Sequence, residues 1–180
     1  MSDEDIEQLE CYVPAIFEDE RGWFSTTFSL ADFNRNRKKS FKVVQRNMSK
    51  SKKNVLRGLH FQIGHNAQAK IVSVIEGEIL DVVVDLREYS PNFGTFAKNI
   101  LSSQNQKCLY VPKGFAHGFF TLSDSATIEY LVDAPYDPEN QRCLIWNDPL
   151  VAIDWPEKIK PILSNKDANG LCFTSIKHFL

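Results

Sequence analysis

One short stretch of the sequence places an arginine and a histidine three residues apart, with a glycine between them. Arg57 and His60 lie within residues 55–62, whose apolar positions predict a β-strand. An odd spacing sends two side chains to opposite faces of an unbroken strand, but a bulge at Gly58 would bring both into one cavity. Histidine, with an unperturbed pKa of about 6.5, can accept a proton at neutral pH. The stretch is therefore a candidate for general-base chemistry.

Two further stretches carry polar side chains on predicted strands. In residues 111–119 a proline and two glycines turn the chain, and His117 follows at the start of a strand. Gln45 and Asn47 share one strand face, because alternate residues point the same way. A single strand histidine is more often structural than catalytic, by roughly two to one. Two histidines near arginine, glutamine and asparagine lower those odds without reversing them.

Two predicted strands mix charged with apolar residues. Lys70 shares its strand face with two valines, so its ammonium group lies either at the rim of the sheet or partly desolvated inside it. In residues 79–86 one face is wholly apolar and predicts core packing, whereas the other carries Asp81 and Asp85. That second face must meet either water or a polar cavity.

Short apolar runs with a period of two dominate the chain and predict strands separated by turns. The predicted strands are residues 12–17, 23–28, 41–47, 55–62, 70–76, 79–86, 95–101, 107–111, 115–122, 126–133 and 143–146. Ser29 and Asp32 form a capping box that predicts one helix, from Ser29 to about Lys38. The segment after Trp155 is expected to form short outer turns. With no repeat or linker, residues 1–180 are predicted to form one domain, a sandwich or barrel of antiparallel strands.

The composition fits a compact chain of one domain. Its 180 residues are 43% hydrophobic and 24% charged, which excludes a disordered or low-complexity protein. A net charge of −2 argues against binding to nucleic acid or to an anionic membrane. No apolar stretch approaches the roughly 20 residues that span a bilayer, and the first residues are acidic where a signal peptide is basic. Four widely spaced cysteines are expected to be reduced and mostly buried, which predicts a cytoplasmic protein.

Seven motifs occur in the order of a known family, from about residue 10 to residue 170. They are Phe17-Glu18-Asp19-Glu20-Arg21-Gly22, Gln45-Arg46-Asn47-Met48-Ser49, Leu56-Arg57-Gly58-Leu59-His60-Phe61-Gln62, Lys70, Asp81-Val82-Val83-Val84-Asp85-Leu86-Arg87, Pro112-Lys113-Gly114-Phe115-Ala116-His117-Gly118-Phe119 and Trp146-Asn147-Asp148-Pro149. One such motif is weak evidence, whereas seven in order are specific. On these residues the chain resembles the dTDP-4-dehydrorhamnose 3,5-epimerase family.

The resemblance implies an all-β fold, a cupin-type jelly roll of antiparallel strands with a few short peripheral helices. It also implies a homodimer that shares strands across its interface. The implied activity is that of an epimerase without cofactor or metal, which inverts C3 and C5, or C3 alone, of a nucleotide-linked 4-keto-6-deoxy sugar. The reaction runs through an enolate by proton abstraction and reprotonation, and it belongs to the biosynthesis of surface-polysaccharide sugars.

The resemblance also implies roles for individual residues. His60 matches the family's catalytic base, and Asp167 matches its dyad partner. Lys70 matches the residue beside the keto oxygen, where an ammonium group stabilises the enolate charge. Tyr130 matches the acid on the opposite face of the sugar. The residues that would hold the nucleotide diphosphate and the sugar are Arg21, Gln45, Asn47, Arg57, His117 and Lys166.

Aromatic residues make up 12% of the chain, and most of its 13 phenylalanines are expected to fill the core. Trp23 and Phe24 follow directly after the Arg21-Gly22 pair, and Tyr136 follows Tyr130 by six residues. These rings are expected to form walls of the sugar-nucleotide site, where they stack on a base or exclude water.

Two positions depart from the family pattern. Thr26 and Gln141 stand where the family usually has glutamate, near the nucleotide or sugar end of the site. The loss of two acidic acceptors leaves the nucleotide open, so that dTDP, GDP or CDP carrying a hexose or a heptose all remain candidates.

Two other classes of protein are alternatives. A metal-dependent cupin oxygenase fits Pro112-x-Gly114-x-x-His117, but the expected His-x-His is His60-x-Gln62 here, and the ligand set stays incomplete. A non-catalytic module that binds sugar nucleotides would be expected to lose the base or the acid, yet His60 and Tyr130 are both present.

Overall fold

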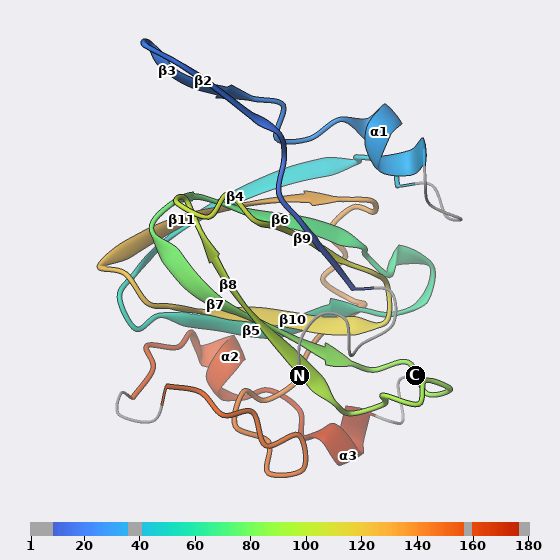
Figure 1. Ribbon diagram of the computed structural model, residues 1–180. Coiled ribbons are helices and arrows are strands. Elements are labelled where there is room, and N and C mark those ends of the chain that lie inside the picture. The colour runs from blue at the N-terminus through green and yellow to red at the C-terminus, as the bar shows by residue number, and fades with distance from the viewer. Residues whose placement is uncertain (1–8, 36–40, 157–159, 177–180) are drawn as a thin grey trace.

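The computed structural model describes residues 9–35, 41–156 and 160–176, which are built around two antiparallel sheets of five strands each (Figure 1). The first sheet has the order β1 (Glu10–Tyr12), β9 (Cys108–Val111), β6 (Lys70–Glu76), β11 (Ser125–Val132) and β4 (Gln45–Lys52). The second has the order β12 (Gln141–Cys143), β5 (Leu56–Gln62), β10 (Phe115–Thr121), β7 (Glu78–Asp85) and β8 (Phe96–Ser102). From β4 to β12 the chain passes repeatedly from one sheet to the other, as in a jelly roll. The predicted all-β jelly roll is confirmed.

Seven predicted strands, from 55–62 to 126–133, lie within one residue of their predicted limits. The predicted strand 12–17 is wrong, because Pro14 lacks the N–H of a sheet residue and separates β1 from β2 (Ile16–Asp19). The predicted strand 23–28 ends early, as β3 (Gly22–Ser25).

Two further strand limits differ for reasons that lie in their pairing partners. The predicted strand 41–47 is β4, which begins at Gln45 and reaches Lys52 because it pairs with β11 along its whole length. The predicted strand 143–146 overlaps β12 (Gln141–Cys143) at Cys143 alone. Ile145 does not extend β12, because it donates its N–H to Leu171 of the C-terminal segment. In both cases a distant segment sets the limit.

The helices are short and peripheral. α1 (Leu30–Arg35) begins as predicted, with the Ser29 hydroxyl accepting the backbone N–H of Asp32 at 3.4 Å. The predicted extension to Lys38 lies outside the described residues. The C-terminal segment forms α2 (Asn165–Ala168) and α3 (Phe173–Ile176) rather than turns alone, and a 3₁₀ turn, η2 (Gly64–Asn66), follows β5. Among the described residues no helix is long and apolar enough to cross a membrane.

Strand β7 is buried on both faces. Ile79 and Val83 point into the core between the two sheets, whereas Val82 and Val84 pack beneath the C-terminal segment on the outer side of the second sheet. Burial of each such side chain contributes roughly 1.5–3 kcal/mol. This packing fixes the C-terminal segment against the second sheet (Figure 1). The face predicted to meet water or a polar cavity meets the interior, where Asp81 has no exposed surface.

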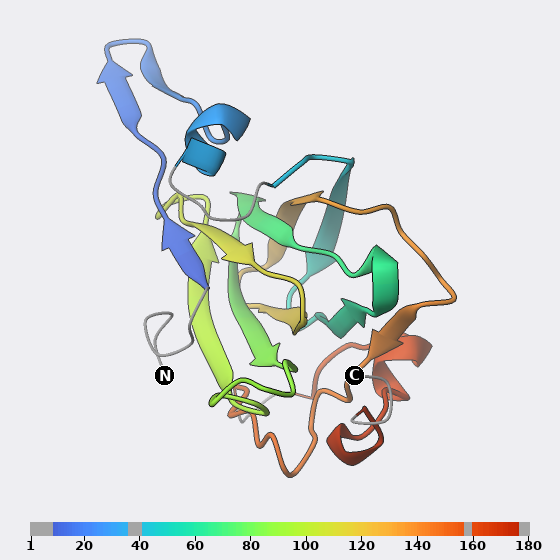
Figure 2. The ribbon, with the colours of Figure 1, turned by 90° about the vertical axis from the view of Figure 1, so that its right-hand side faces the viewer.

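The hairpin formed by β2 and β3 projects away from both sheets, as two perpendicular views show (Figures 1 and 2). It carries three large side chains that are more than half exposed, Phe17 (65%), Trp23 (57%) and Phe24 (66%). Exposed apolar rings gathered on one element are typical of an interaction surface.

Candidate active site

A cavity of about 300 Å³ opens between the two sheets. This volume lies at the lower end of the range for small-molecule sites, about 300–1,000 Å³. Eight of the predicted site residues line it: Gln45, Asn47, Arg57, His60, Lys70, His117, Tyr130 and Tyr136. Gln68, Gly118, Phe119, Val132 and Gln141 complete the lining. Residues far apart in the sequence thus converge on one polar hollow.

A bulge in β5 turns Arg57 and His60 toward this cavity. In the pairing with β10, His60 lies opposite His117 and Arg57 lies opposite Phe119, so β5 contains one extra residue. Gly58, which has φ +119°, approaches β10 so closely that an added Cβ would lie 2.6 Å from the Cα of Gly118. The predicted bulge at Gly58 is confirmed, and no larger residue fits there.

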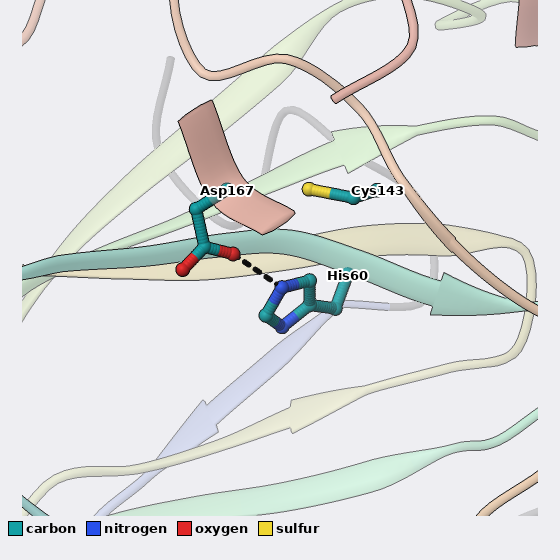
Figure 3. A group of neighbouring side chains, drawn as sticks. All are labelled: His60, Cys143 and Asp167. Atoms are coloured by element: carbon teal, nitrogen blue, oxygen red, sulfur yellow. Dashed lines mark hydrogen bonds and ion pairs between the residues drawn. The ribbon is translucent and has the colours of Figure 1, made fainter. Parts of the chain in front are cut away.

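His60 forms a short hydrogen bond with Asp167, whose carboxylate Oδ1 lies 2.6 Å from Nε2 of the ring (Figure 3). Asp167 is delivered by α2, whose N-cap residue Ser164 accepts the Asp167 N–H and donates its hydroxyl to the Asp167 carboxylate at 2.7 Å. Gly58 donates its N–H to the same carboxylate at 3.3 Å. Burial opposes ionisation of Asp167, but the bonds from His60 and Ser164 outweigh it and hold the carboxyl pKa below its ordinary value. An ionised Asp167 fixes the tautomer of His60.

Lys70 enters the cavity from β6, in the first sheet. Its Nζ lies 3.5 Å from the backbone carbonyl oxygen of His60. Burial lowers the pKa of Lys70 to about 8, and the negative charge of Asp81 opposes this shift. Of the two locations predicted for Lys70, the desolvated one is therefore correct.

Asp81 is a residue that the sequence pattern did not single out as functional. It is fully buried on β7, and its Oδ2 lies 2.7 Å from Nε2 of His117, which is itself buried. Its Oδ1 is buried and has no hydrogen-bond partner in the described part of the chain. The sequence feature that could have pointed to Asp81 was its strand parity, which placed the carboxylate against water or a polar cavity. The structure adds that this carboxylate is the charge that acts on Lys70.

Tyr130 comes from β11 in the first sheet, whereas His60 comes from the second sheet, so the two side chains line the cavity from opposite sheets. The Tyr130 hydroxyl is hydrogen-bonded to the Ser49 hydroxyl at 2.8 Å. Beside it on β4, Gln45 donates to Asn47 at 2.6 Å, which confirms that these two share one face. A base and a phenol on opposite walls suit the inversion of a carbon that lies between them.

The basic residues at the cavity differ in their placement. Arg57 lines the cavity and donates its Nε–H to Ser51 at 3.0 Å, which leaves other guanidinium donors for a ligand. Lys166 does not line the cavity but donates to the Gln141 side chain, which does. Lys166 therefore lies at the edge of the site.

Three more predicted site residues lie away from this cavity. Arg21, Trp23 and Phe24 all lie on the projecting β2–β3 hairpin, where Arg21 donates to Asp19 at 3.1 Å. Thr26, just after β3, is also exposed. Trp23 and Phe24, predicted to form walls of the site, do not line the cavity of their own chain, because the hairpin that carries them projects away from the two sheets.

The thiol of Cys143 lies next to the His60–Asp167 pair (Figure 3). Cys143 ends β12 directly opposite His60 on β5, and donor atoms of Cys143, His60 and Asp167 all lie within 4.8 Å of one another. Burial and the charge of Asp167 raise the pKa of this thiol to about 12. Sequence spacing did not indicate this cluster, because its members come from three distant elements. Cys108 and Cys143 are buried free thiols as predicted, whereas Cys172 is exposed.

Comparisons with known proteins agree on one family. The sequence model of the family described as dTDP-4-dehydrorhamnose 3,5-epimerase matches residues 3–175. The chain is 46% identical over 155 residues to the dTDP-4-dehydrorhamnose 3,5-epimerase of Salmonella typhimurium, covering 86% of this chain and 85% of that protein.

Solved structures of similar proteins have the same fold. The dTDP-6-deoxy-D-glucose-3,5-epimerase from Legionella pneumophila, in complex with dTDP-4-keto-L-rhamnose, is 42% identical with a TM-score of 0.91, covering 95% of this chain and 90% of that one. A 3′-monoepimerase from Streptomyces bikiniensis in complex with dTDP-quinovose is 31% identical with a TM-score of 0.92, covering 99% of this chain and 90% of that one. The similar proteins thus include enzymes that act at two sugar carbons and one that acts at a single carbon.

Proposed function

The chain belongs to the dTDP-4-dehydrorhamnose 3,5-epimerase family, and from this premise we propose that it inverts both C3 and C5 of a dTDP-linked 4-keto-6-deoxy sugar. It is an isomerase that acts on a nucleotide-linked 4-keto-6-deoxy sugar. The observation that carries the proposal is that His60, on the second sheet and hydrogen-bonded to Asp167 of α2, shares one cavity with Tyr130 and Lys70, which come from the first sheet.

His60 is the base in this proposal. Asp167 accepts the Nε2–H of the ring, so that Nδ1 carries the lone pair that removes a proton from carbon. Carbons C3 and C5 both flank the C4 ketone, so loss of a proton from either carbon places negative charge on the same oxygen. One stabilising group at that oxygen therefore serves both inversions.

Lys70 supplies that stabilising charge. An ammonium group in a site sheltered from water lowers the energy of a developing enolate far more than it would in bulk solvent. Asp81 keeps Lys70 charged, because its buried carboxylate raises a pKa that burial alone would depress further. His117 holds Asp81 in place through the 2.7 Å hydrogen bond.

Tyr130 returns a proton to the face opposite His60. We expect Tyr130→Phe to retain proton abstraction but to lose inversion by about 10²–10⁴-fold, the usual contribution of a general acid. The ratio of solvent-deuterium exchange to inverted product, followed by NMR, checks this. Tyr136→Phe, which removes a hydroxyl from the same cavity, should keep the wild-type ratio. Equal loss of exchange and inversion in Tyr130→Phe would contradict the role of acid.

The remaining cavity residues hold the nucleotide diphosphate and the sugar. Arg57 has a forked guanidinium suited to a diphosphate, and Gln45, Asn47, His117 and Tyr136 offer neutral polar contacts to the rest of the ligand.

We infer that the nucleotide is dTDP, although Thr26 and Gln141 replace the family's usual glutamates. The Gln141 side-chain oxygen still accepts a hydrogen bond, from Lys166, so an acceptor is kept there without its charge. Calorimetry should therefore give at least about tenfold tighter binding of dTDP than of GDP or CDP, a difference of about 1.4 kcal/mol. Equal or tighter binding of GDP or CDP would contradict this inference and support one of the other nucleotides that the sequence left open.

The projecting hairpin supports a homodimer in which Arg21, Trp23 and Phe24 complete the site of a second copy. Its exposed rings do not line the cavity of their own chain, and a partner would bury them.

The double variant Trp23→Ser/Phe24→Ser should raise KM by about 10-fold or more, because it removes two ring contacts worth roughly 0.5–1.5 kcal/mol each beyond their burial. Light scattering should give a dimer for the wild type. Tyr89→Ser, at a ring that is 96% exposed, is the control and should change neither KM nor the dimer seen by light scattering. A monomeric wild type with unchanged kinetics in the double variant would contradict this arrangement.

The wider setting follows from these assignments. We propose that residues 1–180 form one epimerase domain, active in the cytoplasm, whose product enters surface-polysaccharide sugar biosynthesis. The proposed steps need neither a cofactor nor a metal. The alternatives of a cupin oxygenase and of a non-catalytic binding module find no support among the similar proteins, which are epimerases.

The product decides between inversion at two carbons and inversion at one. Incubation of the protein with a dTDP-linked 4-keto-6-deoxyhexose, followed by NMR of the sugar ring couplings, should reveal a product inverted at both C3 and C5. A product inverted at C3 alone would restrict the function to that of a monoepimerase.

A further inference from the structure

The cluster of His60, Cys143 and Asp167 contains a thiol that the proposed mechanism does not use. Within the described part of the chain, the thiol makes a weak contact with the neighbouring Leu144 carbonyl oxygen, at 3.6 Å. Cys143 and Asp167 are almost fully buried, whereas His60 lines the cavity and is partly exposed. The cluster is therefore reached from the cavity past His60.

The three donor atoms form a ligand set of a well-known type. Zn²⁺ binds imidazole nitrogen, thiolate sulfur and carboxylate oxygen at about 2.0–2.3 Å, and three protein ligands leave a fourth position for water. Neighbouring ligand atoms around such a tetrahedral ion lie roughly 3.3–3.8 Å apart. The donors here all lie within 4.8 Å of one another, with Nε2 of His60 and Oδ1 of Asp167 at 2.6 Å. Small side-chain rotations would therefore separate the His60 and Asp167 donor atoms and bring the Cys143 sulfur close enough for all three to bind one cation.

We propose that His60, Cys143 and Asp167 form a binding site for a thiophilic divalent cation such as Zn²⁺, and that the bound cation inhibits the epimerase. The inhibition, though not the binding, rests on the role of His60 proposed above. A histidine that binds a metal through Nε2 carries its proton on Nδ1. It then has no lone pair with which to accept a proton from the sugar.

Protons must leave for the cation to bind. The Cys143 thiol loses its proton to solvent to become a thiolate ligand, and His60 changes tautomer, so that its proton moves from Nε2 to Nδ1. Because protons compete with the metal for these donor atoms, binding should tighten as pH rises. Metal binding breaks the hydrogen bond between His60 and Asp167 that the proposed mechanism uses. The site is therefore inhibitory and differs from the site of a resident cofactor.

Direct binding tests the site without any substrate. Protein freed of metal with a chelator is titrated with Cd²⁺, while the ultraviolet charge-transfer band of the cadmium–thiolate bond is followed. The wild type should show a saturable band at one Cd²⁺ per chain that is lost in Cys143→Ser. Cys172→Ser, which removes the exposed thiol, is the matched control and should keep the band. Loss of the band in Cys172→Ser, or its survival in Cys143→Ser, would overturn the proposal.

Activity tests the inhibition separately. Zn²⁺ should inhibit the wild type and Cys172→Ser, and a chelator should restore both. Cys143→Ser, and Cys143→Ala as a second variant in case the first folds poorly, should keep basal activity and need at least about tenfold more Zn²⁺, since loss of even an outer contact costs 10–100-fold in metal affinity. Equal inhibition of all variants would overturn the proposal. If the protein lacked epimerase activity, the cadmium band would still decide whether the site exists.

Discussion

His60→Asn should lower kcat by about 10²–10⁴-fold, the usual contribution of a general base, and should abolish deuterium exchange at both sugar carbons. Asparagine approximates the size and polarity of the ring but cannot take up a proton. Because one base is proposed for both carbons, the losses at C3 and C5 should be equal. Single-turnover kinetics and NMR in deuterated water measure the two effects.

His65→Asn is the matched control for this change. His65 lies exposed on η2, outside the cavity, and its replacement should leave kcat unchanged. Both variants should unfold at temperatures close to that of the wild type. Exchange that survives at either carbon in His60→Asn would refute the assignment of His60 as the base for that carbon.

Lys70→Met should lower kcat by about 10²–10³-fold, as the loss of one electrostatic stabiliser of an oxyanion does. Methionine keeps most of the length of the side chain and loses the charge.

The Lys70→Met change should also stabilise the folded protein at neutral pH. Because the folded pKa of about 8 lies below the ordinary lysine pKa of 10.5, the folded state disfavours the charged lysine. That penalty is fully present below pH 8 and disappears as pH rises toward 10.5.

The pH dependence of kcat separates Lys70 from other groups. Activity should fall as pH rises through about 8, because Lys70 then loses its proton. Asp81→Asn removes the anion that favours the charged lysine and should move this fall to lower pH. Asp124→Asn, at an exposed aspartate paired with Lys53, should leave it in place. A high-pH limb that does not move in Asp81→Asn would contradict the action of Asp81 on Lys70.

The local sequence pattern was sufficient to predict features that depend on neighbouring residues of the same strand. The strand limits of β6 and the bulge at Gly58 follow from the alternation of side chains and from the position of one glycine. The common face of Gln45 and Asn47 follows from strand parity alone. Asp167 was assigned through the family resemblance, because nothing in its neighbourhood in the sequence indicates that α2 reaches β5.

Pattern was insufficient where partners come from distant strands. The pairing of Asp81 with His117 depends on which strands of the second sheet are neighbours, and Cys143 meets His60 only through the register of β12 against β5. Trp23 and Phe24 follow a site motif directly in sequence, yet the hairpin carries them away from the cavity. Proximity in sequence could not distinguish a wall of the chain's own site from a surface offered to a second copy.

Deuterium incorporation by the wild type, in the presence of a chelator, tests the central claim most directly. The protein is mixed in deuterated water with a dTDP-linked 4-keto-6-deoxyhexose, and the C3 and C5 proton signals are followed by NMR. If His60 removes the protons and Lys70 stabilises the charge, both signals should disappear during turnover. Retention of both protons, while the sugar nucleotide still binds, would contradict catalysis through an enolate.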